Sequence, residues 1–479
     1  MSNEKKMVRE ITSMDVDFSK WYTDIIKKAE LAEYSSIKGC MIIRPYGFKI
    51  WENIQSYLDK KFKKTGHENI YMPMFIPESL LKKESDHVEG FAPEAAWVTH
   101  GGNEKLNERM CVRPTSETLF CEHYSNIIES YKDLPKLYNQ WCSVVRWEKS
   151  TRPFLRTTEF LWQEGHTAHE NEDDAMREVL KMLDIYEELC KNILAIPVIK
   201  GKKTNIEKFA GAKQTYTIES MMHDGKALQS GTTHYFSDIF AKAFNITFTD
   251  KNGEQKYVHQ TSWGVSSRLI GSIIMVHGDN KGLCLPPRIA PIQVIIVPIN
   301  IKDDKIINKA YEIYDHLKKH FRCLIDKSNK SAGWKFNQYD MKGIPLRLEL
   351  GSRDFEKNSI TLYRRDTGEK VMIPLNSNLN EIIKEYLDKV HEKLFEKALK
   401  IREQKTYVAK TIEDLKNIYK SKSGFTKVML CDNEECETKI KNEVSITSRC
   451  IPFDQTKLYD KCICCNKPTD TMVLFGKSY

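Results

Sequence analysis

The sequence lacks any long hydrophobic run. Among its 479 residues, the densest apolar stretch lies near Gln293 to Ile299 and is interrupted by Pro298. A helix needs about 20 consecutive apolar residues to span a bilayer. We therefore expect no membrane-spanning segment and no membrane partner.

The sequence also lacks an apolar leader. Residues 1–15 carry several charges and no hydrophobic core, so a secretory signal is not expected. The expected compartment is the cytoplasm, where the 13 cysteines would stay reduced. Six of these cysteines fall after position 430, and this clustering needs a local explanation.

Neither sign of charge dominates the composition. There are 74 Lys plus Arg against 66 Asp plus Glu, a net charge of +8, which is too mild to identify a nucleic-acid partner by itself. A hydrophobic content of 41% and a charged content of 29% are typical of a globular protein. At about 150 residues per domain the length predicts roughly three domains, and the chain has no internal repeat or low-complexity tract.

A helix followed by a strand is predicted near the N-terminus. Apolar residues recur every fourth position from Tyr46 to Lys64, which is the period of an amphipathic helix. A strand is expected from Ile70 to Phe75, and Pro73 places that position at a strand end, an edge or a special junction because proline cannot donate to a ladder.

Strands and one long helix fill most of the next hundred residues. Segments rich in Val, Thr, Phe and Trp predict an antiparallel hairpin. The expected elements are the hairpin strands Leu137 to Glu148 and Thr157 to His169, a helix from Asp173 to Leu194, strands around Tyr216 and Leu228, and a strand from Gln260 to Ser262 leading into Gly264.

A proline-rich seam near Leu285 to Pro291 separates this part from a segment in which strands and helices alternate, the pattern of a small α/β domain. That segment ends with a long helix from about Leu379 to Gln404, and a cysteine-rich tail follows. We therefore expect domains at residues 1–287, 288–405 and 406–479.

The predicted hairpin presents residues suited to a nucleotide. In a strand, alternate side chains share a face, so Arg146 and Glu148 point the same way. Guanidinium groups such as Arg146 and Arg156 fit phosphate oxygens, a carboxylate accepts from an exocyclic amine, and the Phe160 ring can stack on a base. An ordinary surface ion pair is the alternative.

A second candidate segment for binding an anionic ligand contains Arg268. This arginine follows Gly264 and precedes the apolar run Leu269 to Val276, which is typical of a buried helix. An arginine buried at that helix start needs an anion or a carboxylate, whereas one at an exposed helix end needs neither.

Together these segments resemble the three motifs of class II aminoacyl-tRNA synthetases. More specific strings resemble the prolyl-tRNA synthetase family, in the form shared by archaea, the eukaryotic cytoplasm and some bacteria. These strings are Pro114-Thr115-Ser116-Glu117-Thr118, Asn139-Gln140-Trp141, Phe160-Leu161-Trp162-Gln163-Glu164-Gly165-His166, Gln229-Ser230-Gly231-Thr232-Thr233-His234 and Val276-His277-Gly278-Asp279-Asn280.

The resemblance implies an α+β catalytic domain on an antiparallel sheet, an α/β anticodon-binding domain and a small α+β zinc-binding C-terminal domain. The implied reaction activates proline with ATP and Mg²⁺ and transfers it to tRNA(Pro). The implied catalytic residues are Arg146, Glu148 and Arg268. Those implied for proline are Phe91, Thr115, Glu117, Arg146, Trp162, Glu164, His166, Phe209 and His234. Those implied for ATP are Arg146, Glu148, Arg156, Phe160, Gln229, Thr232, Ser266 and Arg268.

Two further sites follow from the same resemblance. Glu349 and Arg353 match positions that read the two guanines of the proline anticodon, with a surface ion pair as the alternative. In the tail, two cysteine pairs separated by a longer loop suit a structural zinc ion. The expected ligands are Cys431, Cys436, Cys462 and Cys465, with Cys464 as the rival fourth ligand and Cys450 as a buried thiol.

The resemblance has departures and alternatives. Ser266 and Ser267 make the third motif degenerate, and the segment between His169 and Ser262 is too short for an inserted editing domain. Without editing, alanine or cysteine would be mischarged. The family implies a homodimer and a tail whose terminal carboxylate lies near the active site. The competing readings are a catalytically inactive paralogue that binds tRNA and a sister class II enzyme for threonine, glycine or histidine.

Overall fold

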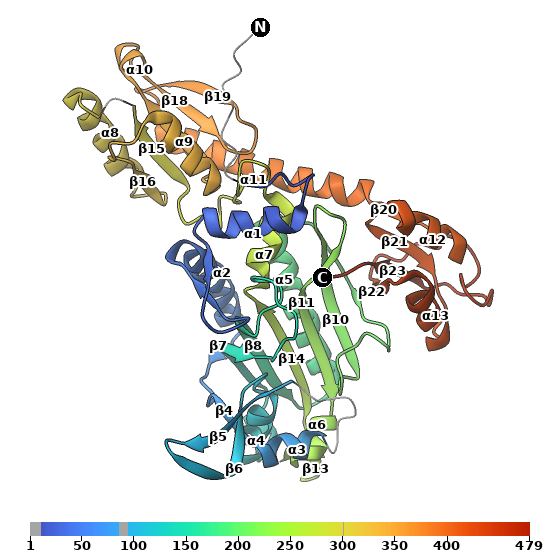
Figure 1. Cartoon of the computed structure of the whole chain (residues 1–479). Helices are drawn as coiled ribbons and strands as arrows, with labels where there is room; N and C mark the ends of the chain where they lie inside the picture. The colour runs from blue at the N-terminus through green and yellow to red at the C-terminus, as the bar shows by residue number, and fades with distance from the viewer. Residues whose placement is uncertain (1–10, 86–93, 300) are drawn as a thin grey trace.

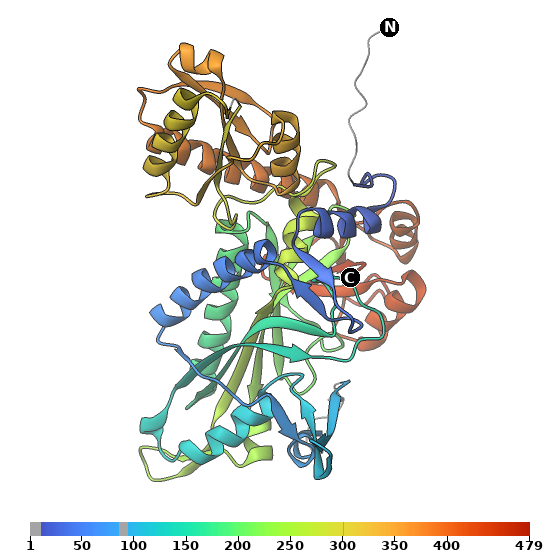
Figure 2. The same cartoon turned by 60° about the vertical axis from the view of Figure 1, so that its left-hand side comes forward.

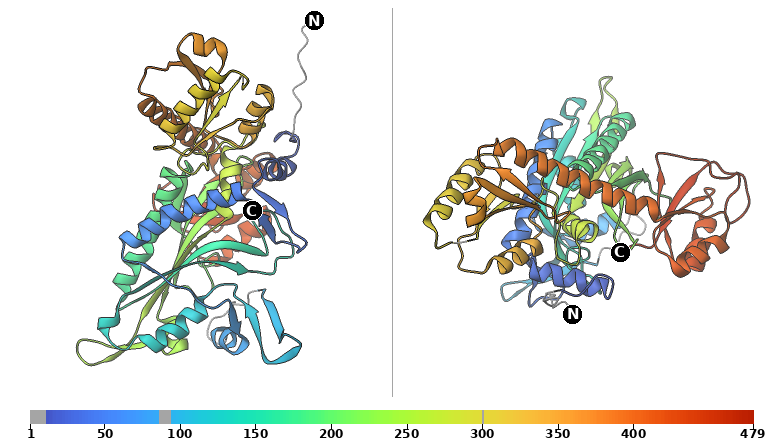
Figure 3. Two further views of the ribbon diagram at one scale, coloured as in Figure 1. Left: turned by 90° about the vertical axis from the view of Figure 1, so that its left-hand side faces the viewer. Right: turned by 90° about the horizontal axis from the view of Figure 1, so that it is seen from above.

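The structure, a computed structural model, describes residues 11–85, 94–299 and 301–479. A large N-terminal domain carries a compact α/β domain at one end and a small C-terminal domain at its side (Figures 1 and 2). Helix α11 (Leu379–Gln404) runs from the α/β domain across the large domain to the C-terminal domain, as the view from above shows (Figure 3). None of the helices in these described ranges is long and apolar enough to cross a membrane.

The large domain is built on an antiparallel sheet, as predicted. Strands β7 and β8 form the expected long hairpin, with Val145 opposite Glu159 at the end joined by the connecting loop. Only the short outer strand β3 runs parallel to its neighbour β7. In spatial order the strands are β9 (Val198–Lys202), β10 (Gln214–Met221), β11 (Ala227–Ser237), β14 (His259–Ser266), β8 (Glu159–His169), β7 (Lys136–Val145) and β3 (Glu68–Asn69).

One face of this sheet is covered by helices with apolar stripes. Helix α5 buries Val179, Met182 and Tyr186 against it, because these residues recur at helical spacing. Pro45 begins helix α2, where its missing N–H costs nothing. The helices of this layer are α1 (Phe18–Lys28), α2 (Pro45–Lys64), α5 (Glu172–Asn192) and α7 (Arg268–His277).

Smaller elements surround the sheet. The helices are α3 (Glu78–Ser85), α4 (Glu117–Ile127), η1 (Tyr131–Asp133) and α6 (Ile239–Phe244). The short strands are β1 (Ala32–Tyr34) with β2 (Met41–Ile43), β4 (Phe75–Pro77) with β6 (Glu104–Val112) and β5 (Ala96–Gly101), and β12 (Thr247–Thr249) with β13 (Gln255–Tyr257).

The α/β domain has a five-stranded mixed sheet. Its inner strand β15 is buried throughout, as expected for a parallel strand covered on both faces. The strands in order are β16 (Cys323–Ile325), β15 (Val294–Pro298), β17 (Leu346–Leu350), β18 (Ser359–Arg364) and β19 (Lys370–Pro374). Its helices are α8 (Asp304–Leu317), α9 (Ala332–Met341), α10 (Ser352–Glu356) and the start of α11.

The C-terminal domain extends the large sheet, since Ile451 pairs with Lys202 across β22 and β9. A buried ion cluster crosses the same junction: the Glu219 carboxylate accepts from Lys203 at 2.9 Å and from Arg449 at 2.9 and 3.0 Å. The elements are β20 (Thr406–Val408), α12 (Ile412–Ser421), β21 (Phe425–Met429), α13 (Glu434–Val444), β22 (Thr447–Pro452) and β23 (Met472–Gly476).

The strand predicted from Ile70 to Phe75 is wrong. Only β3 before it and β4 after it are strands. Between these two strands, side chains from other parts of the chain satisfy the backbone hydrogen-bonding groups. The Met72 N–H donates to Gln140, and the Met72 carbonyl accepts from Arg113 at 2.8 Å. With these groups satisfied, the segment needs no neighbouring strand.

Candidate active site

One cavity of about 260 Å³ opens on the sheet face away from α5, between β8, β10, β11 and β14. Most of the residues implied for proline and ATP line it, and they come from far apart in the chain. They are Thr115, Glu117, Arg146, Phe160, Trp162, Glu164, His166, Phe209, Gln229, Thr232, His234, Ser266 and Arg268.

Strand β8 supplies four of these side chains in a row. Phe160, Trp162, Glu164 and His166 alternate along the strand, so the pleat points all four into the cavity. One strand therefore runs through the whole site, with aromatic rings at one end and charged groups at the other.

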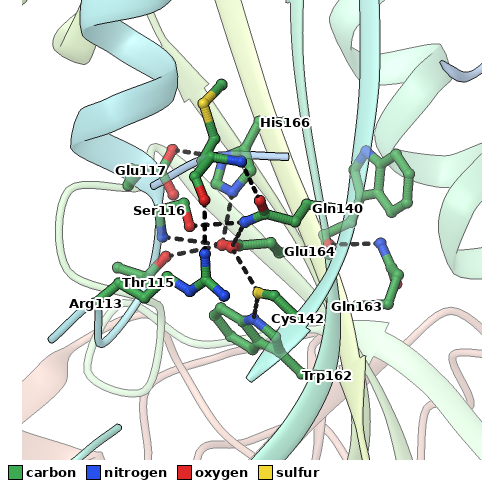
Figure 4. A network of polar contacts seen from close by, with 12 residues as sticks. Arg113, Thr115, Ser116, Glu117, Gln140, Cys142, Trp162, Gln163, Glu164 and His166 are labelled. Atoms are coloured by element: carbon green, nitrogen blue, oxygen red, sulfur yellow. Dashed lines mark hydrogen bonds and ion pairs between the residues drawn. The ribbon is translucent and has the colours of Figure 1, made fainter. Parts of the chain in front are cut away.

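The Glu164 carboxylate is the centre of a buried hydrogen-bond network (Figure 4). It accepts from the Ser116 backbone N–H at 3.0 Å and from the Thr115 hydroxyl at 3.3 Å. It also accepts from the Gln140 amide at 2.9 Å and lies 3.0 Å from His166 Nε2. Burial opposes its ionisation, but the His166 and Ser116 hydrogen bonds outweigh burial and lower the pKa of Glu164 to about 2.

His166 lies between two carboxylates. Its Nδ1 is 3.3 Å from Glu117 Oε1, its Nε2 contacts Glu164, and its ring stacks on Phe120 at 4.2 Å. Burial would make the imidazole neutral, but the charges of Glu117 and Glu164 outweigh it and raise the pKa of His166 to about 10. At neutral pH this end of the cavity holds one cation and two anions, so a net negative charge is available to a cationic ligand.

The opposite wall of this end is apolar and neutral. The His234 ring lies 4.7 Å from the Phe209 ring, and its Nδ1 is 3.0 Å from the Thr215 hydroxyl. Burial, helped by the charges of His166 and Arg146, lowers the pKa of His234 to about 3. His234 therefore stays uncharged and adds packing surface rather than charge.

The other end of the cavity holds two half-buried arginines. Arg146 Nε donates to the Pro114 carbonyl at 3.1 Å, and Arg268 Nε donates to the Leu155 carbonyl at 3.1 Å. Burial lowers the pKa of Arg146, and burial with the charges of Arg146 and Arg156 lowers the pKa of Arg268 to about 10. Both remain cationic at neutral pH, and within the described ranges neither forms an ion pair with a carboxylate. Such groups favour an anionic ligand.

Two of the implied residues that the structure describes do not line the cavity. Glu148 and Arg156 pair with each other in the loop that connects the hairpin strands, with Arg156 Nε 3.2 Å from Glu148 Oε2 and the arginine 60% exposed. Phe91 lies outside the described residues. The ion pair that was the alternative for the hairpin is thus present for these two residues, beside a cavity that Arg146 enters.

Several residues that hold the site were missed. Ser116, Gln140 and Cys142 surround Glu164, and Cys142 Sγ also accepts from the Trp162 indole at 3.3 Å. Gln140 and Cys142 are two apart on β7, and that alternation was the available signal. Glu207 also lines the cavity, and no local pattern in the sequence marks it.

The two anticodon candidates lie apart from the cavity, in the α/β domain. Glu349 on β17 is buried, with one oxygen 3.0 Å from Arg347 Nε and the other 2.7 Å from Lys370 Nζ. Arg353 lies exposed on the short helix α10. The structure brings both to one end of the domain but does not pair them with each other.

Four tail cysteines converge, and their Sγ atoms all lie within 4.8 Å of one another: Cys431, Cys436, Cys462 and Cys465. The Cys464 thiol points elsewhere and donates to the Cys436 carbonyl at 3.2 Å. Four thiols at this spacing fit a tetrahedral zinc ion. Cys450 is fully buried away from this group, as expected.

Known proteins match this chain along its whole length. The family model described as tRNA synthetase class II core domain (G, H, P, S and T) matches residues 97–277, the anticodon binding domain model matches residues 293–386, and the prolyl-tRNA synthetase C-terminal model matches residues 412–479. No editing insertion interrupts these matches.

Curated relatives carry one name. The proline–tRNA ligase of Clostridium novyi is 62% identical, and that of Ruminiclostridium cellulolyticum is 61% identical, each over 479 residues that cover both chains completely. A crystal structure of prolyl-tRNA synthetase from Cryptosporidium parvum, complexed with halofuginone and AMPPNP, superposes with a TM-score of 0.93 at 40% identity over 98% of this chain and 99% of that one. The chain therefore belongs to the prolyl-tRNA synthetases, the class II aminoacyl-tRNA synthetases also named proline–tRNA ligases.

Proposed function

We propose that this cavity makes prolyl-adenylate from L-proline and ATP, and that the prolyl group then passes to the 3′ end of tRNA(Pro). The observation that carries the proposal is the split of charge within one cavity. Two half-buried arginines without carboxylate partners in the described ranges form one end, and two buried carboxylates sharing one imidazolium form the other. An anion fits the first end and a cation fits the second.

The carboxylate end would bind proline. The secondary ammonium of proline has two N–H donors, for which the Thr115 hydroxyl and the Glu117 carboxylate are suitable acceptors. The ring would lie in the pocket formed by Trp162, Glu164, His166, Phe209 and His234, all of which line the cavity.

The arginine end would bind ATP as its Mg²⁺ complex. Arg146 would bridge the proline carboxylate and the α-phosphate, while Arg156 and Arg268 would contact the outer phosphates. Glu148 would accept from the adenine amine, and Phe160 with Arg268 would enclose the ring. Gln229, Thr232 and Ser266 also line the cavity and would complete the nucleotide contacts.

The chemistry needs no covalent enzyme intermediate. A proline carboxylate oxygen attacks the α-phosphorus, the bond from phosphorus to the bridging oxygen breaks, and pyrophosphate leaves with that electron pair. Catalysis then rests on holding two anions in line and on stabilising the charge that grows at phosphorus. Magnesium brought in with ATP neutralises part of the triphosphate charge.

Exchange of pyrophosphate into ATP tests the proposal with a panel of amino acids. The expected result is exchange that depends on proline. Exchange that depends instead on threonine, glycine or histidine would identify a sister specificity. No exchange with any amino acid, together with retained tRNA binding, would identify an inactive paralogue.

The proline pocket should also accept smaller substrates. A missing methylene in an apolar pocket costs only about 1–3 kcal/mol of discrimination, so alanine and cysteine would be activated at high concentration. Without an editing insertion, mischarged tRNA would be cleared by a separate protein. Purified enzyme incubated with alanine and tRNA(Pro) should accumulate alanyl-tRNA, and efficient clearance by the enzyme alone would contradict this.

The cysteine cluster would hold one structural Zn²⁺. Four thiolates leave no open position for water, and such ligands persist in a reducing compartment such as the cytoplasm. Cys465→Ser should therefore lower bound zinc per chain in elemental analysis, whereas Cys464→Ser should not. Equal zinc loss in both variants would contradict the ligand set.

The segment between β3 and β4 would form a homodimer interface. Tyr71 is 70% exposed, and Met74 and Phe75 are each 43% exposed, so a contiguous apolar stretch faces outward beside the motif-1 helix α2. Sedimentation of the 55.8 kDa chain should give a dimer, and Tyr71→Asp should shift it toward monomer. A wild-type monomer at micromolar concentration would contradict this.

A further inference from the structure

A tight turn lies within the loop that joins the two arms of the long hairpin. Its backbone closes at Arg152 and Arg156, where the Arg152 N–H donates to the Arg156 carbonyl at 2.6 Å and the Arg156 N–H donates to the Arg152 carbonyl at 2.9 Å. Between them, Phe154 has φ of +58°, a left-handed conformation that a bulky residue adopts only when its surroundings impose it. Contacts with other parts of the structure must therefore hold this turn in its conformation.

The turn touches the arginine end of the cavity directly. It contains Arg156, and its Leu155 carbonyl accepts the hydrogen bond from Arg268 Nε at 3.1 Å. Leu155 itself is 4% exposed and packs within the main core. Any displacement of the turn would therefore move the group that aims Arg268.

The Arg152 side chain lies in an aromatic clamp. Its guanidinium carbon is 5.0 Å from the centre of the Tyr22 ring and 5.0 Å from the centre of the Tyr479 ring. Its Nε and Nη2 atoms are buried and have no hydrogen-bond partner among the described residues. Without polar partners for these two atoms, the contacts with the rings are what fixes the side chain.

Both tyrosines are anchored. Tyr22 on α1 is fully buried, and its hydroxyl donates to the Pro153 carbonyl of the same turn at 2.6 Å. Tyr479 is the last residue of the chain; its hydroxyl donates to Asp224, and its N–H donates to the Ala227 carbonyl at 3.2 Å. Figure 1 shows this terminus leaving the C-terminal domain and lying against the large domain near β11.

We propose that Arg152 is a positioning residue for ATP, held by Tyr22 and by the chain-terminal Tyr479, so that the last residue of the C-terminal domain sets the geometry of the arginine end of the active site. The clamp acts through the turn and does not itself touch the substrate. This inference rests on the proposed nucleotide roles of Arg156 and Arg268.

Steady-state pyrophosphate exchange on the full-length chain tests the clamp, with KM measured separately for ATP and for proline. Loss of a desolvated cation–ring contact is expected to raise the KM for ATP about tenfold in Arg152→Met and in Tyr479→Ala. The KM for proline should stay within about twofold, because the carboxylate end does not contact the turn. Arg152→Lys and Tyr479→Phe keep a cation and a ring, and should recover most of the ATP affinity.

Lys318→Met is the matched control. It removes an exposed cation that lies 5.1 Å from the Tyr314 ring in the α/β domain and also pairs with Asp315, so it deletes a cation–ring contact far from the cavity. It should leave both KM values unchanged. Melting temperatures of all variants, measured without ligands, separate loss of folding from loss of ATP binding.

Three outcomes would overturn the clamp: an unchanged KM for ATP in Arg152→Met, equal rises in both KM values, or no recovery in Arg152→Lys. An Arg268→Ala variant assayed alongside separates the two levels of the argument. If it loses exchange while Arg152→Met binds ATP normally, only the clamp is wrong. If it keeps full exchange, the proposed nucleotide site is wrong and the clamp falls with it.

Discussion

The cavity proposed to be catalytic and the end of the α/β domain expected to read the anticodon treat their charged residues in opposite ways. In the cavity, Arg146 and Arg268 are half-buried and have no carboxylate partner in the described ranges. In the α/β domain, both oxygens of Glu349 already have cationic partners, Arg347 and Lys370. One site is ready for an anion, whereas the other is neutralised by its own neighbours.

This difference suits the two kinds of ligand. A triphosphate is small and highly charged, and pre-arranged donors stabilise it without reorganisation. A guanine base is neutral, and its edge would compete with Lys370 and Arg347 for the Glu349 carboxylate, whose two oxygens each already have a cationic partner. We therefore expect the small-molecule site to bind without rearrangement and the RNA site to rearrange on binding.

Removing the cavity's central cation should have the largest effect. Arg146→Ala deletes a donor to charge that develops in the transition state, which typically costs about 3–4 kcal/mol. Exchange measured as kcat/KM should fall by about two to three orders of magnitude. Arg146→Lys, which keeps the charge but not the fork, should recover only part of the loss. If the exchange activity of Arg146→Ala stays within about tenfold of wild type, Arg146 does not stabilise the transition state. The proposed contrast between the two regions then fails.

The charge of His166 gives the cavity a specific dependence on pH. Its pKa is raised from 6.5 to about 10 in the folded chain, so its contribution to stability is complete below pH 6.5 and is lost as the pH rises through 10. His166→Gln removes one partner of a buried ionic group, which costs about 3–5 kcal/mol. The melting temperature of the variant should lie well below that of wild type at pH 6, and the gap should narrow toward pH 10. A gap that is constant over this range would show that His166 is neutral.

Arg353 should affect only the RNA-dependent step. Arg353→Ala removes a donor proposed to read a guanine, and a good bidentate contact of this kind is worth about 1–3 kcal/mol. Aminoacylation of tRNA(Pro) should drop by about one to two orders of magnitude, while pyrophosphate exchange without tRNA stays at the wild-type rate. A parallel fall in exchange would mean that the substitution damages the catalytic domain.

Lys370 should give the smallest effect and the sharpest test of the contrast. Lys370→Met frees one oxygen of Glu349, which a 49% exposed lysine holds in the free protein. Because exposed pairs are worth about 0.2–1 kcal/mol, KM for tRNA(Pro) should fall by no more than about fivefold. A rise in the KM for tRNA(Pro) would contradict the comparison, because it would show that Lys370 contacts RNA directly.

Local sequence patterns predicted much of this structure. Contacts between residues far apart in the sequence explain what those patterns missed. Alternation along β8 placed Phe160, Trp162, Glu164 and His166 on one face, and the predicted helix Leu379 to Gln404 is the helix α11 observed. The segment from Ile70 to Phe75 has strand-like residues, but contacts with side chains on other elements replace its ladder.

The same limit applies to the functional sites. The partner of Glu349 at Lys370 lies 21 residues away, and the partners of Arg152 come from the first described helix and the last residue. No local spacing reports such pairs, because they arise only when separate strands, helices and chain ends pack together.

The most direct test of the account is a structure of the full chain with a non-hydrolysable prolyl-adenylate analogue. The prediction is that the Arg146 guanidinium lies within about 3 Å of both the group that replaces the α-phosphate and the prolyl carbonyl, with the prolyl nitrogen at Thr115 and Glu117. An analogue bound in the opposite direction, with adenine against Glu117 and Glu164, or bound outside this cavity, would contradict the account.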